Sequence, residues 1–411
     1  MIQKVDKKKL KIAYLLPGAI HSASGGVAVV LQHVNRLKQR GYQVYVIVLH
    51  GDHHVSWFKR NHVEVVGMDF FGKSFKGVDI LVATHWYTAD VVAKSAAKRK
   101  VYFVQSDERR FVINEENLRK VEDTYKFEIE YMTEAKWIQR WLSEEFGHDA
   151  YYVPNGLDQE IFHKAEPLEK RGNKIRVLIE GPIDSHFKGV KDAYNAVDGL
   201  DVELWIVSSF GSPPKEWHYD KFLSNVPIEK MKNVYSACDI LLKMSRVEGF
   251  FGPPMEAMNC GCAVIVSKCT GYDEYIIDGK NALVVEKGDV EASRNAIKKL
   301  INNPDLRENL VKNGYQTAKD WNWDKSIDLL EKMINGEKPE RFYTKDKPEI
   351  YDYKREMIDV RYQVTIAEYA IKQFTEDFFL KSYLSVNKAL RKMGREAIKL
   401  WNSIKQGYRS Q

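Results

Sequence analysis

Short apolar runs alternate with segments of helical periodicity in the first part of the chain, and this pattern constrains the fold most strongly. Residues 10–16 are a continuous apolar run, and a loop rich in Gly and Ser follows. Apolar residues then recur at helical spacing from Val27 to Leu37, and Gly41 ends the segment before a second apolar run at 42–49. A strand, a loop, a helix and a strand in that order are the building block of a parallel α/β sheet.

The same alternation continues along the chain and begins again after a strand end and turn at 151–158. The further strands that it predicts lie at 63–66, 80–84, 101–105, 175–180, 202–207, 240–244, 263–266 and 282–285. The further helices that it predicts lie at 86–98 and 115–128, from Val190 onward, and across 287–336. The sequence therefore predicts two successive parallel-sheet α/β domains facing a cleft, at 1–150 and 151–318. A crossover helix at 319–336 and a charged linker with a basic helical extension at 337–411 complete the predicted organisation.

Composition narrows the possible partners and the compartment. The net charge of +6 permits anionic ligands, but there is no zinc-ligand spacing, repeat or aromatic-basic module, so no nucleic-acid partner is expected. Four cysteines without metal-ligand spacing predict reduced, buried thiols and a cytoplasmic protein. No apolar run approaches the roughly 18 residues of a membrane-spanning helix. The run at 12–16 ends at Pro17, so it is interpreted as a first strand and not as a signal peptide.

Two acidic residues in a Gly- and Pro-rich run at 247–258 are the most informative candidates for chemistry. Glu248 lies in the loop and Glu256 lies about one turn into the following helix, eight positions later (256 − 248). A loop that opens a helix offers free backbone N–H groups to an anion. Two carboxylates beside it can accept hydrogen bonds from hydroxyls. A sugar nucleotide fits this arrangement, as do other phosphorylated polyols, and the plain alternative is that Glu256 only favours its helix end electrostatically.

Several segments of the second half occur in the order seen in family-4 glycosyltransferases, and the chain resembles that family over residues 9–335. The segments that carry the resemblance are 153–158, 188–189, 247–258, 271–275 and 278–282. In the first half the resemblance rests on Gly25 and Gly26 and on the run 83–86, which is similar to one in surface-polysaccharide rhamnosyltransferase relatives. The resemblance implies the GT-B fold, two Rossmann-like domains, and a retaining, nucleotide-sugar-dependent transferase.

The resemblance also assigns roles to particular residues. It implies that Glu248 contacts hydroxyls of the donor sugar and that Glu256 accepts hydrogen bonds from the ribose diol. It implies that the loop of Gly25 and Gly26 lies against the diphosphate and the reacting sugar, where glycine permits close backbone approach. His85 ends the strand predicted at 80–84, the edge at which α/β proteins bind ligands, and family members place a comparable residue near the donor sugar. The alternatives are an ordinary loop for the two glycines and an ordinary loop histidine.

Lys188 is the candidate for neutralising the diphosphate. A lysine in the loop after the strand at 175–180 can act as a point charge on phosphate, or it can be an ordinary solvated lysine. The family commonly has an Arg six positions earlier, and this chain has Pro182 there. Either another group compensates, with His186 and Arg246 as candidates, or phosphate binding is weaker. Glu248, His85 and Lys188 form the predicted catalytic set.

The loop before the second acidic residue completes the predicted donor site. Gly249, Phe250, Phe251 and Gly252 are expected to bind the donor together with Gly25, Gly26, Lys188, Glu248 and Glu256. The common family form has one Phe before the loop glycine, whereas this chain has two, so the backbone contacts of the loop are expected to differ. No Asp-x-Asp pair occurs in the chain, and carboxylates usually hold a divalent ion on a diphosphate. The prediction is therefore a transferase without a metal or other cofactor.

Other candidates concern the acceptor and the membrane. A glycan or a lipid-linked acceptor is expected, and Arg109 and Arg110 are interpreted as binding a charged acceptor or as ordinary surface residues. Apolar and basic residues alternate at helical spacing over 380–405, which suits peripheral association with an anionic membrane or packing against another helix or chain. Two other functions remain open: a catalytically silent scaffold or partner subunit, favoured by Pro182, and a sugar-nucleotide epimerase.

Overall fold

The computed structural model describes residues 7–18, 24–51, 57–72, 74–112 and 114–339. All of them belong to one compact unit, Met1–Ile350. The predicted basic segment at 380–405, and nearly all of the predicted extension at 337–411, therefore lie outside the described residues. Within the described part, no helix has the length and apolar character needed to cross a membrane.

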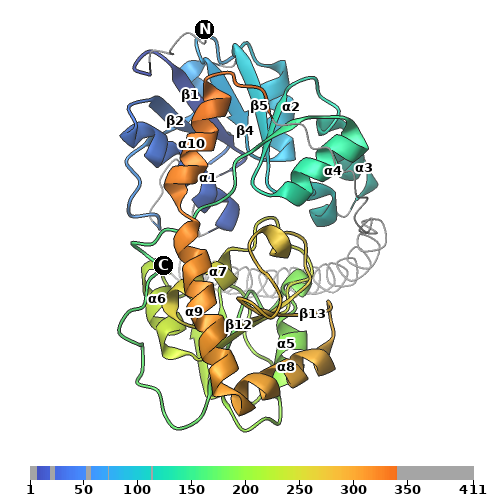
Figure 1. The fold of residues 1–411 in the computed structure, drawn as a ribbon. Helices are drawn as coiled ribbons and strands as arrows, with labels where there is room; N and C mark the ends of the chain where they lie inside the picture. The colour runs from blue at the N-terminus through green and yellow to red at the C-terminus, as the bar shows by residue number, and fades with distance from the viewer. Residues whose placement is uncertain (1–6, 19–23, 52–56, 73, 113, 340–411) are drawn as a thin grey trace, which may run out of the picture. The chain divides into compact units, whose positions relative to one another are not determined.

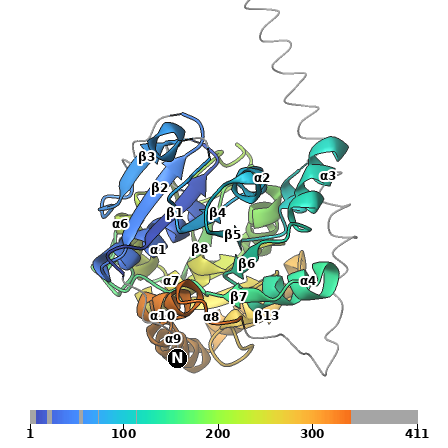
Figure 2. The same ribbon diagram turned by 90° about the horizontal axis from the view of Figure 1, so that it is seen from above.

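The first domain is a parallel sheet of seven strands with helices packed on it (Figure 1). In sequence order its strands are β1 (Lys11–Leu16), β2 (Gln43–Val48), β3 (Glu64–Gly67), β4 (Ile80–Ala83), β5 (Arg99–Val104), β6 (Glu130–Thr133) and β7 (Ala150–Tyr152). Its helices are α1 (Gly25–Gln39), α2 (Trp86–Lys94), α3 (Glu115–Thr124) and α4 (Lys136–Phe146), with short 3-10 helices η1 (Met68–Phe71) and η2 (Glu108–Phe111). The strands lie in the order β3-β2-β1-β4-β5-β6-β7, which Figure 2 shows across the sheet.

The second domain is a parallel sheet of six strands in the order β10-β9-β8-β11-β12-β13. Its strands are β8 (Arg176–Glu180), β9 (Glu203–Ser208), β10 (Lys221–Ser224), β11 (Ile240–Lys243), β12 (Ala263–Ser267) and β13 (Leu283–Val285). Its helices are α5 (Val190–Val197), α6 (Ile228–Ala237), α7 (Gly252–Cys260), α8 (Val290–Asn302) and α9 (Pro304–Asp320), with 3-10 helices η3 (His186–Lys188) and η4 (Tyr272–Glu274). Two parallel-sheet domains of this kind confirm the predicted fold class.

The last described helix, α10 (Trp323–Ile334), follows the second domain in sequence but packs on the first. Ile327 and Leu330 are fully buried in the same apolar cluster as residues of β1 and α1. On the outer side, Arg40 after α1 bonds to both Asp328 and Glu331 at 2.6 Å. The chain therefore crosses back to the first domain between α9 and α10, which follow one another in orange in Figure 1.

Strand β7 lies across the boundary that the sequence suggested near residue 150. Its residues pair in parallel with β6, so Tyr151 and Tyr152 close the first sheet and do not begin the second. Neither β6 nor α4 was predicted, although Trp137, Ile138 and Trp141 of α4 are buried as its apolar face. Strand β10 was also missed, because its residues are only partly buried at the edge of the second sheet.

In both sheets the order in which strands are added reverses at an equivalent point. This point lies between β1 and β4 in the first domain and between β8 and β11 in the second. Ligands of parallel α/β sheets bind at the carboxyl ends of strands where the order reverses. The loops that leave these four strands hold Gly25, His85, Lys188 and Glu248, which are four of the predicted site residues. The topology alone therefore brings residues far apart in sequence to corresponding edges of the two sheets.

Candidate active site

A cleft of about 820 Å³ is lined by residues of both domains. This volume lies within the range of ordinary small-molecule sites, roughly 300–1,000 Å³. The predicted site residues that line it are Gly25, Gly26, His85, Lys188, Glu248, Gly249, Phe250, Gly252 and Glu256. The structure therefore collects nearly the whole predicted set around one opening.

Phe251 is the exception among the predicted donor-binding residues. Its side chain is fully buried in the apolar core of the second domain, and it does not line the cleft. Its backbone carbonyl accepts a hydrogen bond from the hydroxyl of Tyr275. Phe250, next to it, lines the cleft and packs against Trp321 and Tyr275. The N–H of Gly252 bonds to the carbonyl of Phe250 at 3.0 Å, so the chain turns tightly at Phe251; Phe251 faces the core and Phe250 faces the opening.

Lys188 and Glu248 form an ion pair within the cleft. The Nζ of Lys188 lies 2.9 Å from Oε1 and 2.8 Å from Oε2 of Glu248. Burial opposes the charge of each group, but the Glu248 carboxylate raises the pKa of Lys188 and the Lys188 ammonium lowers the pKa of Glu248. Lys188 is therefore not an ordinary solvated lysine, and both side chains remain charged and fixed in position before any ligand arrives.

Gly189 explains how Lys188 comes so close to the second sheet. Its backbone has φ of +59°, in the left-handed region, and a Cβ there would lie 1.9 Å from the carbonyl oxygen of Met244. Glycine is required on both counts, because it tolerates positive φ and has no side chain to collide. The Lys-Gly sequence thus holds the lysine over the end of β11.

A second buried lysine, which the sequence did not single out, lies on β11 itself. Lys243 is 2% exposed and its Nζ donates to Oε2 of Glu180 at 2.5 Å. Its positive charge also acts to lower the pKa of both Glu248 and Glu256. A lysine within the apolar run 240–244 was the available signal, since lysine is almost never buried without a partner.

Glu256 differs from Glu248 in its electrostatic state. Burial, and secondarily the charge of Glu180, raise the pKa of Glu256 to about 8. The hydroxyl of Tyr235 donates to its Oε2 at 3.2 Å. The two acidic residues of the motif are therefore distinct: Glu248 is a paired carboxylate and Glu256 is mostly protonated near neutral pH.

Only one of the two helix starts at the cleft offers an anion the free donors that the sequence suggested. The N–H of Gly252, at the start of α7, bonds to the carbonyl of Phe250, and Pro253 and Pro254 have no N–H. The start of α7 therefore offers few donors to an anion, contrary to the expectation. The start of α1 does: Ser24 makes no side-chain cap, no acidic residue lies in the first turn, and Gly25 and Gly26 line the cleft.

Neither candidate for replacing the missing Arg at position 182 reaches the cleft. The Nη2 of Arg246 pairs with Asp192 at 2.6 Å, and its guanidinium packs against Gly288. His186 and Arg246 are both absent from the cleft lining, where Lys188 is the only Lys or Arg among the described residues. Neither candidate for compensation therefore faces the cleft, and weaker phosphate binding stays a prediction.

His85 and Glu108 meet on the first-domain side of the cleft. His85 caps α2: its Nδ1 accepts the N–H of Tyr87 at 3.2 Å, so the proton of the neutral ring is on Nε2. That Nε2 lies 3.5 Å from Oε1 of Glu108. Burial lowers the pKa of His85 to about 4 and raises that of Glu108 to about 8. His85 is therefore a hydrogen-bond donor toward the cleft at neutral pH, and not a base.

Glu108, which follows β5 in the chain, is a further cleft residue. Its Oε2 accepts the N–H of Trp86 at 2.7 Å and the hydroxyl of Tyr102. These bonds fix the carboxyl group against the start of α2 and direct Oε1 to His85. The side chain lines the cleft, so one oxygen is available to a ligand.

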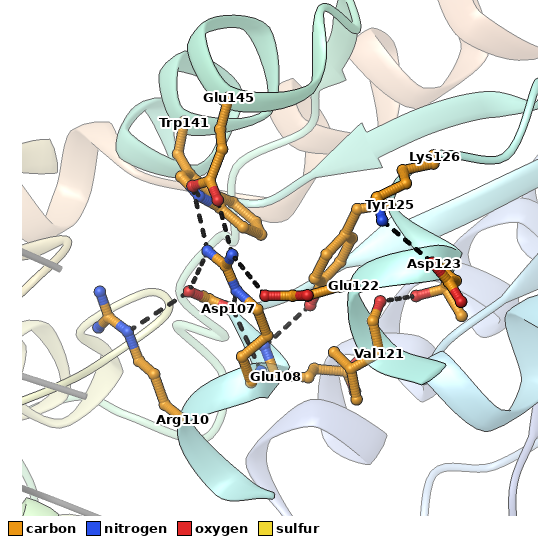
Figure 3. A network of polar contacts seen from close by, with 12 residues as sticks. Asp107, Glu108, Arg110, Val121, Glu122, Asp123, Tyr125, Lys126, Trp141 and Glu145 are labelled. Atoms are coloured by element: carbon orange, nitrogen blue, oxygen red, sulfur yellow. Dashed lines mark hydrogen bonds and ion pairs between the residues drawn. The ribbon is translucent and has the colours of Figure 1, made fainter. Parts of the chain in front are cut away.

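Arg109 and Arg110 are buried in the first domain, and neither belongs to the lining of the cleft. Arg109 pairs with Asp107 at 2.9 Å and with Glu145 at 2.6 Å. Figure 3 shows Arg110 reaching toward Asp107, and Glu145 beside Trp141. Both arginines are buried, and neither lines the cleft. They hold η2 against α4. The interpretation as ordinary surface residues is therefore wrong, whereas binding of a charged acceptor stays a prediction.

Gly249 joins the two domains at the base of the cleft. A Cβ at Gly249 would lie 2.0 Å from the carbonyl oxygen of Gln105 and 2.7 Å from Oε1 of Glu134. The Nε1 of Trp137 donates to the Gly249 carbonyl at 2.9 Å. Burial raises the pKa of Glu134 to about 8. Glycine is needed here because the backbones of the two domains touch, whatever the ligand.

Metal ligation has no obvious candidate in the described part of the chain. There, no group of three or more His, Cys, Asp or Glu side chains gathers in a way that would hold an ion. The prediction that the chain needs no metal stays a prediction.

The second domain resembles known proteins in sequence, and both domains resemble them in fold. Residues 220–317 match the model of the family described as glycosyl transferases group 1. An uncharacterized glycosyltransferase of Methanocaldococcus jannaschii is 26% identical over 205 residues, which are 47% of this chain and 55% of that protein. The chain thus spans about half the length of that curated relative. The resemblance to group 1 glycosyltransferases predicted from the sequence is confirmed.

Solved structures share the architecture of the described domains. Sucrose-phosphate synthase from Thermosynechococcus elongatus superposes with a TM-score of 0.66 at 17% identity, covering 80% of this chain and 99% of that one. Anabaena HepE, solved in complex with UDP-glucose, superposes with a TM-score of 0.64 at 15% identity, covering 80% and 100%. At these identities the similarity concerns the fold, and it confirms the GT-B architecture.

Proposed function

We propose that this GT-B chain, whose second domain carries the group 1 glycosyl transferase segment, transfers a sugar from a nucleotide-sugar donor to a hydroxyl acceptor with retention of configuration. One observation carries the proposal. The Lys188–Glu248 ion pair and Glu256 line the same cleft as the uncapped start of α1 and His85. These groups match the three parts of a nucleotide sugar: its diphosphate, its sugar and its ribose.

The donor is held mainly by the second domain in this proposal. The Glu256 carboxylate accepts both ribose hydroxyls, because a carboxylate can take two O–H donors at once. The start of α1 and the Lys188 ammonium face the diphosphate, since a helix N-terminus and a lysine both favour anions. Glu248 holds the ammonium of Lys188 in place and accepts hydroxyls of the sugar. The UDP-glucose bound to HepE supports a donor of this class.

The chemical step needs no protein base in this proposal. The acceptor oxygen forms a bond to the anomeric carbon on the face from which the diphosphate leaves, while the bond from that carbon to the phosphate oxygen breaks. The departing phosphate oxygen takes the acceptor proton, so the products are the glycoside and the nucleoside diphosphate. Lys188 stabilises the negative charge that develops on the leaving group, and electrostatic stabilisation of this kind usually contributes most to catalysis. The Nε2–H of His85 donates to a hydroxyl of the donor sugar.

The test is nucleoside-diphosphate release over a panel of UDP-, GDP-, ADP- and dTDP-sugars, with and without saccharide acceptors. We expect release with at least one donor, unchanged by EDTA, and a product whose anomeric proton has the same configuration as the donor in NMR spectra. Inversion would contradict retention, and loss of activity with EDTA would contradict metal independence. Conversion of free donor into its epimer without acceptor would instead identify an epimerase.

A catalytically silent partner subunit is the second candidate function. Pro182 removes the usual cation, and Arg246 is held by Asp192 outside the cleft, so Lys188 is the only Lys or Arg that the described lining offers to the diphosphate. No release with any donor, together with stable binding to another transferase, would favour this candidate.

A cytoplasmic location is supported by the four cysteines, which are buried free thiols. Peripheral association with a membrane through 380–405 stays a proposal.

A further inference from the structure

Aromatic side chains give the first-domain wall of the cleft an apolar surface. Trp57 precedes β3, Trp86 is the first residue of α2, and Phe111 ends η2; all three line the cleft. Phe111 is 52% exposed and meets Phe187 of the second domain edge-on, with ring centroids 5.4 Å apart. Phe187 precedes Lys188, so this aromatic surface extends to the edge of the proposed donor site.

Polar atoms without partners lie on the same wall. The Nε1 of Trp57, the Oε1 of Gln105 and the Oγ of Ser106 are buried and have no hydrogen-bond partner within the described part of the protein. Buried polar atoms are bonded in nearly all native proteins, so such exceptions point to a missing partner. The three atoms include a donor, an acceptor and a hydroxyl that can do both. Together with Oε1 of Glu108, they form a set suited to the hydroxyl groups of a ligand.

The wall has no cation that could bind a phosphate. Among the described residues that line the cleft, Lys188 is the only Lys or Arg, and it belongs to the second domain. Arg109 and Arg110, the cations closest in sequence to Phe111, are buried inside the first domain and do not line the cleft. The first domain contributes the acids Glu108 and Glu134 to the lining, and each would repel a phosphate whenever it is ionised. A phosphorylated acceptor would therefore lose its hydration without gaining an ion pair.

We infer that the acceptor is an uncharged saccharide, bound with a ring face on the aromatic wall and its hydroxyls on Gln105, Ser106 and Glu108. A sugar ring has an apolar C–H face and a hydroxyl edge, which matches an aromatic surface beside unpartnered polar atoms. The inference rests on the proposed transferase function and specifies its acceptor. It excludes acceptors that present a phosphate next to the reacting hydroxyl, such as inositol phosphates and sugar phosphates.

The test measures acceptor binding directly, with the nucleoside diphosphate present, by quenching of tryptophan fluorescence and by saturation-transfer NMR. The probes are neutral methyl glycosides and disaccharides, the matching sugar 6-phosphates, and inositol 1-phosphate. We expect at least one neutral probe to bind at least tenfold more tightly than its phosphorylated form. Tighter binding of the phosphorylated probes, or no binding of any neutral probe while the nucleotide binds, would overturn the inference.

Variants separate this inference from the transferase proposal. Phe111→Ala and Ser106→Ala should each raise KM for the neutral acceptor at least fivefold and leave KM for the donor within twofold. Phe210→Ala, at a ring that is 69% exposed and away from the cleft, is the matched control and should change neither. Unchanged acceptor KM in both cleft variants would overturn the inference. Failure of every donor to bind or react would instead overturn the proposed function.

Discussion

The ammonium of Lys188 lies 2.8 Å from the carboxylate of Glu248, and this pair stands at the place where the second sheet reverses its strand order. The lysine comes from the loop after β8 and the glutamate from the loop after β11, which are adjacent strands, and the two residues are 60 positions apart in the chain. The side chain of Glu248 is 10% exposed and that of Lys188 is 30% exposed. Each therefore depends on the other for its charge.

Removing Lys188 should affect stability as well as chemistry. Lys188→Met leaves the Glu248 carboxylate buried without its cation, so we expect a loss of about 2 kcal/mol in the free energy of unfolding, less than the roughly 3–5 kcal/mol of a fully buried pair. In the double variant Lys188→Met, Glu248→Gln, part of that loss should return, because the unpaired charge is gone. Urea denaturation checks both. A double variant less stable than Lys188→Met would contradict this account.

The kcat values of the same two variants should not change in parallel with their free energies of unfolding. Lys188→Met should lower kcat at least a hundredfold, because the charge on the leaving group is no longer neutralised. The double variant should stay as inactive as the single one even where it is more stable. Recovery of kcat in the double variant would show that Lys188 has only a structural role.

Glu256 and Glu248 should differ in nucleotide binding. Glu256→Ala should abolish the rise in melting temperature that a nucleoside diphosphate causes, because it removes the acceptor of the ribose hydroxyls. Glu248→Ala should retain most of that rise and mainly lower kcat. Differential scanning fluorimetry at a saturating nucleotide concentration tests the ranking, and the reverse order would contradict the assigned roles.

Nucleotide affinity should rise with pH as Glu256 ionises. Its pKa is raised to about 8, and the ribose diol selects the ionised form, so affinity should increase up to about tenfold per pH unit below 8 and level off above it. Calorimetric titration at several pH values between 6.5 and 9 measures the nucleotide affinity. Each affinity is corrected for ionisation of the nucleotide phosphate. The variant Glu256→Gln and a 2′,3′-dideoxy nucleotide should both lack the rise. A rise that persists in both would assign it to another group.

Gly249→Ala and Gly25→Ala should have opposite effects. A Cβ at Gly249 meets the Gln105 carbonyl at 2.0 Å, so the domains must separate, and we expect a loss of about 2 kcal/mol in stability. A Cβ at Gly25 has no atom within 4 Å, so stability should stay equal or increase, while donor affinity falls because the group faces the diphosphate. Denaturation and nucleotide titration of both variants test this. Equal stability losses would contradict the distinction.

Glu134 should make the protein less stable as pH rises. The pKa of Glu134 is raised from 4.5 to about 8 in the folded protein, so between these values the unfolded chain releases a proton that the folded protein keeps. The free energy of unfolding then falls with increasing pH, by up to about 1.4 kcal/mol per unit. Glu134→Gln cannot ionise, so its stability relative to the natural protein should grow between pH 5.5 and 8. Glu128→Gln, at an exposed side chain, is the matched control, and parallel curves for both variants would contradict the prediction.

Most strands and the position of the site follow from local sequence. Apolar runs such as 240–244 predict buried strands because both faces of a parallel sheet are covered. Loops that leave such strands bring their residues to one edge, so Lys188, Glu248 and His85 were identifiable before any coordinates. Regions of weaker pattern were missed: in β6 only Tyr131 and Met132 lie between the polar residues Glu130 and Thr133, and β10 is half exposed at a sheet edge.

Side-chain partners were decided by the tertiary structure alone. The sequence gives no sign that Phe251 faces the core while Phe250 faces the cleft, or that Arg109 is enclosed by Asp107 and Glu145. The start of α7 was expected to bind an anion, but its N–H groups are used or missing.

The sequence by itself determined that this protein has two parallel α/β sheets with acidic and basic residues at their carboxyl edges, because periodicity and turn residues act over a few positions. Only the tertiary structure decided that Lys188 pairs with Glu248, that Gly249 touches Gln105, and that His85 meets Glu108. These contacts join residues 23 to 144 positions apart (108 − 85 and 249 − 105). Burial, charge and pKa depend on such neighbours, and neighbours are set by packing of the whole chain.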